Sequence, residues 1–275
     1  MGGSLARTIQ SAGHDLVVWN RSPEKMQPFQ EGGVTCASDF GDALVASPVI
    51  LICVSNYTDA LSLFNEDGVP RNLEGRTIVQ LTSGSTRDAV NAAQFFHDRH
   101  ALYLDGAILS EPDGIGTGAA RILLSGDESA NKIAFRLLEC LGDDTVRYLG
   151  DNVKVASTLD MAWLMTVYGS FIAGVHAANI CQSEGVDVGD LRSLLTNDPI
   201  LAEYLKVVEQ DSYDDVTAPL QVWSDALHHI QEQGAAANIN TEIPDFFASF
   251  FSKAMAAGYG QKNVMSLLKI LQADT

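Results

Sequence analysis

Two residues on one apolar stretch have the types and spacing for proton chemistry. No Lys, Arg, Asp or Glu lies between Asp160 and Glu184, and Tyr168 follows Asp160 by eight positions. A helix over 157–184 would place both residues on one face, because eight residues make a little over two turns. A carboxyl and a phenol placed this way can exchange protons with a substrate. Two plainer interpretations remain open: Asp160 caps the helix, or Tyr168 is a core residue with a satisfied hydroxyl.

The same stretch, residues 161–183, is long enough to cross a membrane. It contains many small residues together with His176 and Asn179, and it lacks a flanking Lys/Arg bias, since Glu184 and Asp187 follow it directly. Membrane helices carry a positive bias at one end, so we predict instead a central helix buried by its own chain or by a partner subunit, and no membrane association.

The sequence before this helix alternates between strand and helix patterns. Short apolar, β-branched runs predict strands at 16–19, 34–36, 48–54, 77–81, 102–105, 122–125 and 146–148. This alternation predicts a doubly wound α/β sheet with right-handed crossovers. The sequence after the helix has no strand pattern and predicts helices at 190–195, 200–210, 219–233, 243–257 and 260–273. We therefore expect a dinucleotide-binding domain at 1–150, an inter-domain helix at 151–186 and a helical dimerisation and substrate domain at 187–275.

Ligands of such sheets bind at the carboxyl ends of the strands. Arg21 is the one obvious cation there and lies between Asn20 and Ser22, with Lys25 one turn further on. An acidic residue at this position would bind the ribose hydroxyl of NAD, whereas arginine suits the 2′-phosphate of NADPH. The plainer alternative is an arginine on a surface turn. The predicted NADPH-binding residues at the strand ends are Asn20, Arg21, Ser22, Lys25, Val54, Ser55 and Thr82.

The first residues depart from the usual dinucleotide fingerprint, which is a strand, then Gly-x-Gly-x-x-Gly, then a helix. Here Met1-Gly2-Gly3 leads directly into a predicted helix at 3–12. Gly2 can be the last glycine of the fingerprint, whereas the strand and the first two glycines are absent. We expect that Met1 is not the true start of the natural protein.

Composition restricts the other ligands. The hydrophobic content of 46% and charged content of 19% allow a folded core, and the formal net charge of −18 argues against nucleic acid and anionic membranes. The four cysteines are scattered without a Cys-x-x-Cys pair, which predicts reduced thiols in a cytoplasmic protein. No metal site is predicted.

The chain resembles the imine reductases, and most closely their fungal reductive aminase branch within the β-hydroxyacid dehydrogenase superfamily. The matching stretches cover nearly the full chain: MGGSLA, GHDLVVWNRSPEK, VILICVSN, TIVQLTSGST, LDGAILSEPDGIG, ILLSGDE, YLGDN and LDMAWLMTVYGSFIAGVHAA. The resemblance implies a Rossmann domain that binds NADPH, a long inter-domain helix, and a helical domain that wraps a second subunit in a domain-swapped homodimer. It implies reduction of imines to amines, with small carbonyl compounds and amines as substrates.

The resemblance also assigns roles to residues. Hydroxyacid dehydrogenases carry Lys-x-x-Asn on the long helix, where this chain has Asp160 and Trp163. A carboxylate attracts an iminium ion that a lysine would repel, so Asp160 is the expected catalytic acid–base group. Tyr168 matches the tyrosine of the family, and Gln221 matches a glutamine near the nicotinamide. Ser83 stands where fungal reductive aminases have asparagine, which favours plain imine reduction over reductive amination.

Two alternatives to an imine reductase remain at this point. An NADP-dependent β-hydroxyacid dehydrogenase is disfavoured by the missing lysine and asparagine and by the lack of a basic pocket at 106–117. A non-catalytic, NADPH-binding dimeric scaffold is favoured by the missing first strand and disfavoured by the retained pair of Asp160 and Tyr168.

Overall fold

The computed structural model describes residues 1–273, which form two compact units. The first unit spans Met1–Asp160, and the second begins at Met161. Each unit has its own buried apolar core. The long helix α7 (Lys154–Ser183) begins in the first unit and continues through the second.

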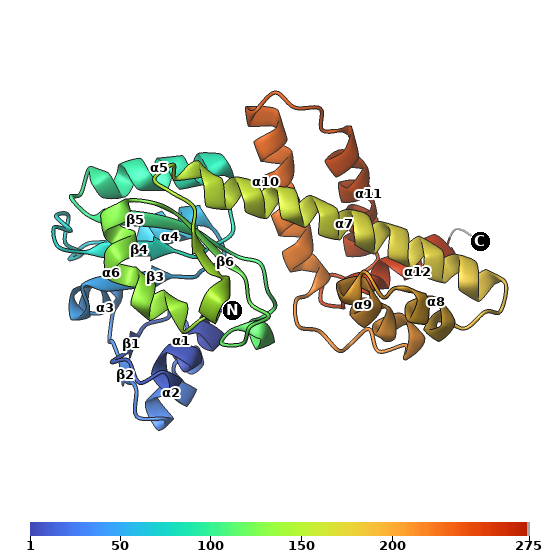
Figure 1. Cartoon of the computed structure of the whole chain (residues 1–275), viewed down its shortest axis with the longest axis horizontal. Helices are drawn as coiled ribbons and strands as arrows, with labels where there is room; N and C mark the ends of the chain where they lie inside the picture. Colours follow the sequence, from blue (N-terminus) through green and yellow to red (C-terminus); the bar gives the residue numbers. More distant parts are fainter. Residues whose placement is uncertain (274–275) are drawn as a thin grey trace. The chain divides into compact units, whose positions relative to one another are not determined.

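The first unit alternates strands and helices, as predicted (Figure 1). Its strands are β1 (Val17–Val18), β2 (Thr35–Cys36), β3 (Val49–Ile52), β4 (Thr77–Gln80), β5 (Leu102–Ile108), β6 (Ile122–Gly126) and β7 (Val146–Tyr148). Its α-helices before α7 are α1 (Gly2–Ser11), α2 (Gln27–Glu31), α3 (Phe40–Ala46), α4 (Tyr57–Leu63), α5 (Thr86–His97) and α6 (Glu128–Glu139).

The strands form two sheets. β1 and β2 make a parallel pair, and β3-β4-β5-β6-β7 make a five-stranded sheet in sequence order. Within the larger sheet, β6 runs antiparallel to β5 while the other pairs are parallel. The structure therefore confirms the Rossmann-like α/β class and adds that the sheet is mixed. One cross-strand row matters below: Gln80 pairs with Asp105, and Asp105 pairs with Ser125.

Helices cover both faces of the five-stranded sheet. On one face, α3, α4 and α5 pack on Ile52, Ile78 and Tyr103. On the other face, α1 and α6 pack on strand residues that alternate with these, such as Val79 and Leu104. Because side chains alternate along a strand, Gln80 and Asp105 lie on the α4 and α5 face. These two buried polar side chains interrupt a core that is otherwise mostly apolar on that face.

The second unit is all-helical. After α7 come α8 (Val188–Leu194), α9 (Pro199–Glu209), α10 (Leu220–Ala236), α11 (Glu242–Ala256) and α12 (Leu267–Ala273). α10 and α11 lie side by side as an antiparallel pair (Figure 1). The predicted last helix at 260–273 was too long, because a 3-10 turn at Val264–Ser266 precedes α12.

α7 is the one helix in residues 1–273 that is long and apolar enough to span a membrane. Of its most apolar stretch, 39% is buried. Core helices of globular proteins meet the same criterion. Ala156, Asp160 and Tyr168 are among its buried residues, which shows that α7 contributes to the cores of the two units.

Candidate active site

The first turns of α7 are held to the sheet by a buried serine. Ser125 on β6 is fully buried, and its hydroxyl donates to the carbonyl of Val153 at 3.0 Å. The same oxygen accepts from the backbone N–H of Ala156 at 3.0 Å. Thr158 adds a second attachment, since its hydroxyl lies 3.0 Å from that of Thr86 at the start of α5. These bonds fix the place at which α7 leaves the sheet.

Asp160 lies one helical turn after Ala156 and is 5% exposed. Burial raises the pKa of its carboxyl group to about 7, because the charged form loses hydration. The position of Asp160 well inside α7 also argues against a role as N-cap, since the helix begins at Lys154. A carboxyl group that titrates near neutral pH can both take up and release a proton, which is what a general acid–base group requires.

The loop after β4 carries Ser83, whose side chain is exposed. The preceding Thr82 is buried, and its hydroxyl accepts from the backbone N–H of Val54 at 3.1 Å. This bond joins the carboxyl ends of β3 and β4. Gly84 allows the loop to lie against Tyr57, because a Cβ atom at Gly84 would come within 2.6 Å of the Tyr57 ring. Ser83 is thus held at the edge of the sheet at which ligands of this fold bind.

Asn20, Arg21 and Ser22 form an exposed turn after β1. The Asn20 side-chain oxygen accepts from the Ser22 N–H at 2.9 Å, which shapes the turn. The Arg21 guanidinium is 75% exposed and lies 3.8 Å from Asp59, in the first turn of α4. This pair brings the β1 turn next to the end of β3. Lys25 is also exposed, in the 3-10 turn at Pro23–Lys25.

The start of α1 approaches the same edge of the sheet. A Cβ atom at Gly2 would lie 3.5 Å from the carbonyl oxygen of Cys53, which directly follows β3. Helix N-termini favour anions, so Gly2 and Arg21 offer two kinds of phosphate contact along one edge. This arrangement fits NADPH: Asn20, Arg21, Ser22 and Lys25 would hold the 2′-phosphate, and the ends of β3 and β4 would face the rest of the cofactor.

Tyr168 and Gln221 belong to the second unit, whereas the other predicted site residues belong to the first. Tyr168 is fully buried and its hydroxyl donates to the backbone carbonyl of Trp223 at 2.5 Å. The Gln221 side chain donates to Asp225 at 2.7 Å. The structure therefore gives both side chains partners inside their own unit, and their catalytic and cofactor roles remain predictions.

Sequence reasoning missed a buried acidic group in β5. Asp105 is fully buried, and both Tyr57 and Tyr103 donate to its Oδ1 atom, at 2.5 and 3.2 Å. The available signal was an acidic residue within an otherwise apolar predicted strand. Such residues are rarely buried without a partner, which here comes from tyrosines on α4 and β5.

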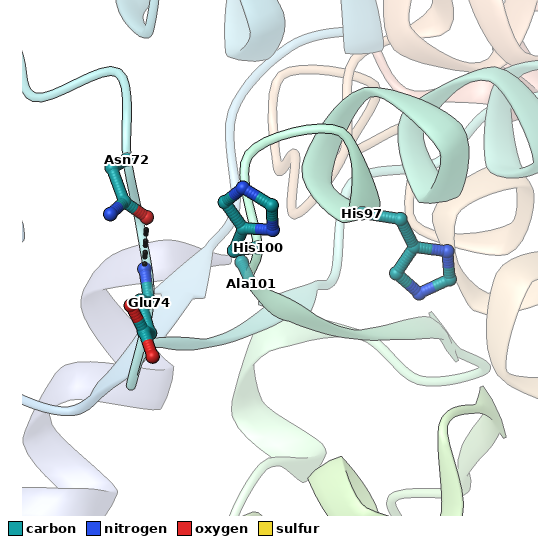
Figure 2. A pocket seen from close by; sticks show the side chains of 5 residues that line it. All are labelled: Asn72, Glu74, His97, His100 and Ala101. Atoms are coloured by element: carbon teal, nitrogen blue, oxygen red, sulfur yellow. Dashed lines mark hydrogen bonds between the residues drawn. The ribbon is translucent and has the colours of Figure 1, made fainter.

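A surface hollow of about 550 Å³ lies elsewhere on the first unit, lined by Asn72, Glu74, His97, His100 and Ala101 (Figure 2). These residues immediately precede β4 and β5, so the hollow lies at the amino ends of the strands. In the figure, Asn72 and Glu74 lie on one loop and are joined by a hydrogen bond from the Glu74 backbone N–H, at 3.0 Å. The hollow is at the opposite edge from the residues that fit NADPH.

A Rossmann-like unit with an arginine turn for a 2′-phosphate, a long helix with a buried carboxyl group, and a helical second unit define an NADP-dependent dehydrogenase. Comparison with known families agrees. Residues 1–150 match the NAD binding domain of 6-phosphogluconate dehydrogenase, and residues 152–273 match the C-terminal domain of NADPH-dependent reductive aminase-like proteins.

Individual relatives narrow the class. An NADPH-dependent reductive aminase of Aspergillus oryzae is 28% identical, over 98% of this chain and 93% of the relative. The structure of a reductive aminase from Aspergillus terreus, in complex with NADPH and ethyl levulinate, is 28% identical with a TM-score of 0.68, covering 98% of this chain and 95% of that one. A 3-hydroxyisobutyrate dehydrogenase from Salmonella typhimurium has a TM-score of 0.86 at 17% identity, over 98% and 95% of the two chains, which shows a shared fold only. This chain belongs to the imine reductase and reductive aminase family.

Proposed function

We propose that the protein reduces imines and iminium ions to amines with NADPH. The observation that carries this proposal is Asp160, a buried carboxyl group on α7 whose pKa is raised to about 7 by burial. The family membership supplies the reaction class, and the Arg21 turn supplies the preference for NADPH over NADH.

The chemistry assigns Asp160 a simple role. NADPH, when bound, supplies a hydride to the imine carbon, and the nitrogen must gain or keep a proton as it becomes an amine. The protonated Asp160 can donate that proton to a neutral imine. Its ionised form attracts an iminium ion and can accept a proton from the product ammonium. A pKa near 7 makes both forms available at neutral pH, whereas a lysine in this place would repel the iminium ion.

Ser83 bears on the substrate range. Its hydroxyl is shorter than the asparagine of fungal reductive aminases and offers one donor in place of two. We propose that the protein acts on preformed imines more readily than it joins carbonyl compounds with amines. An excess of product from a cyclic imine over product from an equivalent ketone and amine would support this.

We also propose that the protein is a cytoplasmic homodimer, and that Tyr168 and Gln221 contribute to the site as the family resemblance implies. The second unit presents several exposed apolar side chains on three of its helices and one loop: Ile180, Val222, Ile239, Ile243 and Phe246. A subunit interface would remove such side chains from water. The reduced state of the four free cysteines is compatible with the cytoplasm.

The test compares two reactions by absorbance of the reduced cofactor. The purified protein is incubated with NADPH and a cyclic imine, and separately with NADP⁺ and a 3-hydroxy acid. We expect imine-dependent consumption of NADPH that falls at least ~100-fold in Asp160→Asn, the range that general acid–base groups contribute. Asp113→Asn, a change of an exposed aspartate, is the matched control. Oxidation of the hydroxy acid without imine reduction would make the protein a hydroxyacid dehydrogenase instead.

A further inference from the structure

Asp105 is a buried acidic group for which the proposed reaction has no direct use. Its Oδ1 atom accepts from two phenols, Tyr57 and Tyr103, whereas its Oδ2 atom is buried with no hydrogen-bond partner among residues 1–273. One strand away in the same row, the Gln80 side chain is fully buried, and both of its polar atoms are also unpaired there. An ionised carboxylate with one bare, buried oxygen is costly, so a proton on Oδ2 is favoured.

The row that contains Asp105 leads to Asp160. Its neighbour in the row, Ser125, bonds to Val153, which directly precedes α7, and to Ala156 in the first turn of α7. Asp160 follows Ala156 by four residues and therefore lies on the same face of the helix. Ala156 and Asp160 are both buried in the first unit. The two carboxyl groups are close enough that a charge on Asp160 raises the pKa of Asp105.

We propose that Asp105 is a positioning residue that acts through Asp160, and that the two carboxyl groups share a single proton at neutral pH. This inference deepens the proposed function, on which its catalytic meaning rests. With one proton for two groups, Asp105 can hold the proton while Asp160 is ionised and attracts the iminium ion. In the alternative state, Asp160 holds the proton and Asp105 carries the negative charge. Asp160 can then donate the proton to a neutral imine.

The groups that face this pair support the sharing. Around Asp105 lie Tyr57 on α4, Tyr103 on β5, Asp88 on α5 and Asp160 on α7. The two phenols stay neutral because burial and the nearby Asp105 raise their pKa values well above the usual range. Burial raises the pKa of Asp105 to about 7, the value that burial also gives Asp160. No cation is among these groups, so none of them offsets a second negative charge, and two carboxyl groups that interact strongly titrate in two steps.

The experiment follows the carboxyl carbons of aspartate by ¹³C NMR between pH 5 and 9, in protein labelled on aspartate. Asp105→Asn and Asp160→Asn each remove one resonance and so assign it. In the unmodified protein we expect both resonances to move in two steps across this range. In Asp105→Asn, we expect Asp160 to titrate in one step, lower by about one pH unit than the upper step, because the opposing charge is gone.

A second variant guards against misfolding of Asp105→Asn. Tyr57→Phe keeps the Asp105 carboxyl group but removes a hydroxyl that stabilises its charge, so Asp105 should titrate higher and Asp160 lower. Asp113→Asn, on the surface, should leave both titrations unchanged. An Asp160 titration that is identical in the unmodified protein, Asp105→Asn and Tyr57→Phe would overturn the inference, and if Asp105→Asn does not fold, Tyr57→Phe decides alone.

Activity separates this inference from the proposed function. Where imine reduction is present, the limb of the pH profile of kcat/KM that reports Asp160 should move with its NMR titration in Asp105→Asn, which a purely structural role would not produce. The protein could fail to reduce imines while the two carboxyl groups still titrate together. That result would support the shared proton and contradict only the proposed imine reduction.

Discussion

At the scale of single residues, this protein has two carboxyl groups in places where burial makes their ionised form costly. Asp105 and Asp160 are both nearly inaccessible, and burial raises both pKa values from 3.8 to about 7. Charged groups in such places are characteristic of functional sites, because the same burial that lowers stability makes the group reactive near neutral pH. Arg21, at the carboxyl ends of the strands, differs from these buried carboxyl groups because its side chain is exposed and available to a ligand.

The two raised pKa values predict how stability depends on pH. Well below pH 3.8, both carboxyl groups are protonated in the folded and unfolded states, so they carry no penalty. Between pH 4 and 7 the unfolded state ionises first, and the free energy of unfolding falls by up to ~4 kcal/mol for each group, less for the coupled pair. Urea unfolding at pH 4.5, 6 and 8 should show that Asp160→Asn gains stability over the unmodified protein as pH rises. A constant difference across this range would contradict the raised pKa.

The Arg21 turn predicts the choice of cofactor. Arg21→Ala should raise the KM for NADPH about tenfold or more while changing the KM for NADH little, because only NADPH carries the 2′-phosphate. Steady-state kinetics with both cofactors measure this. Arg136→Ala, on the exposed side of α6, is the control and should change neither value. Equal losses with both cofactors would show that Arg21 does not contact the 2′-phosphate.

At the scale of elements, the start of α7 is the point at which the long helix is attached to the five-stranded sheet. Ser125 satisfies the carbonyl of Val153 and the N–H of Ala156 at once. A single buried hydroxyl therefore sets where the helix begins, and with it the position of Asp160.

Ser125→Ala tests this attachment. The loss of a buried hydroxyl that serves two backbone groups should lower the free energy of unfolding by about 1–3 kcal/mol. Hydrogen exchange at Ala156 should become faster, because its N–H loses its acceptor. Ser129→Ala, at an exposed position of α6, is the matched control. Unchanged exchange at Ala156 would show that the helix start is held by other contacts.

The helices and strands could be predicted from the sequence better than the way in which they pair and pack. β-branched runs such as 48–54 and the apolar helix at 157–184 identified β3 and α7 because their periodicity is local. The antiparallel pairing of β6 with β5, and the meeting of Tyr57 with Asp105 across 48 positions, depend on tertiary packing. Asp160 was found through its type and family position, whereas the burial of Asp105 depends on Tyr57, which lies 48 positions away in the sequence.

At the scale of the whole molecule, the exposed apolar side chains of the second unit are the feature that bears on the proposed homodimer. Ile239 is 63% exposed, Ile243 62% and Phe246 55%. All three belong to the α10–α11 connection or to α11 itself, and the Phe246 ring contacts those of Phe247 and Phe250. Under the proposed homodimer, these side chains are buried by the second subunit.

Phe246→Ser should weaken such a dimer without unfolding the chain, since the side chain is exposed within the subunit. Light scattering coupled to size exclusion should show a dimer for the unmodified protein and a larger monomer fraction for the variant. Ile133→Ser, which changes an apolar residue of α6 that is 52% exposed, should leave the dimer intact. A monomer for the unmodified protein at micromolar concentration would contradict the proposed assembly.

Under the proposed function, this chain transfers a hydride from NADPH to a C=N carbon with Asp160 as the acid–base group. The most direct measurement is a single turnover with NADPH deuterated at the transferred position of C4 and a cyclic imine, followed by mass spectrometry of the product. We predict one deuterium in the amine, at the former imine carbon, and at least ~100-fold slower formation in Asp160→Asn. Amine without deuterium, or equal rates in the two proteins, would contradict the account.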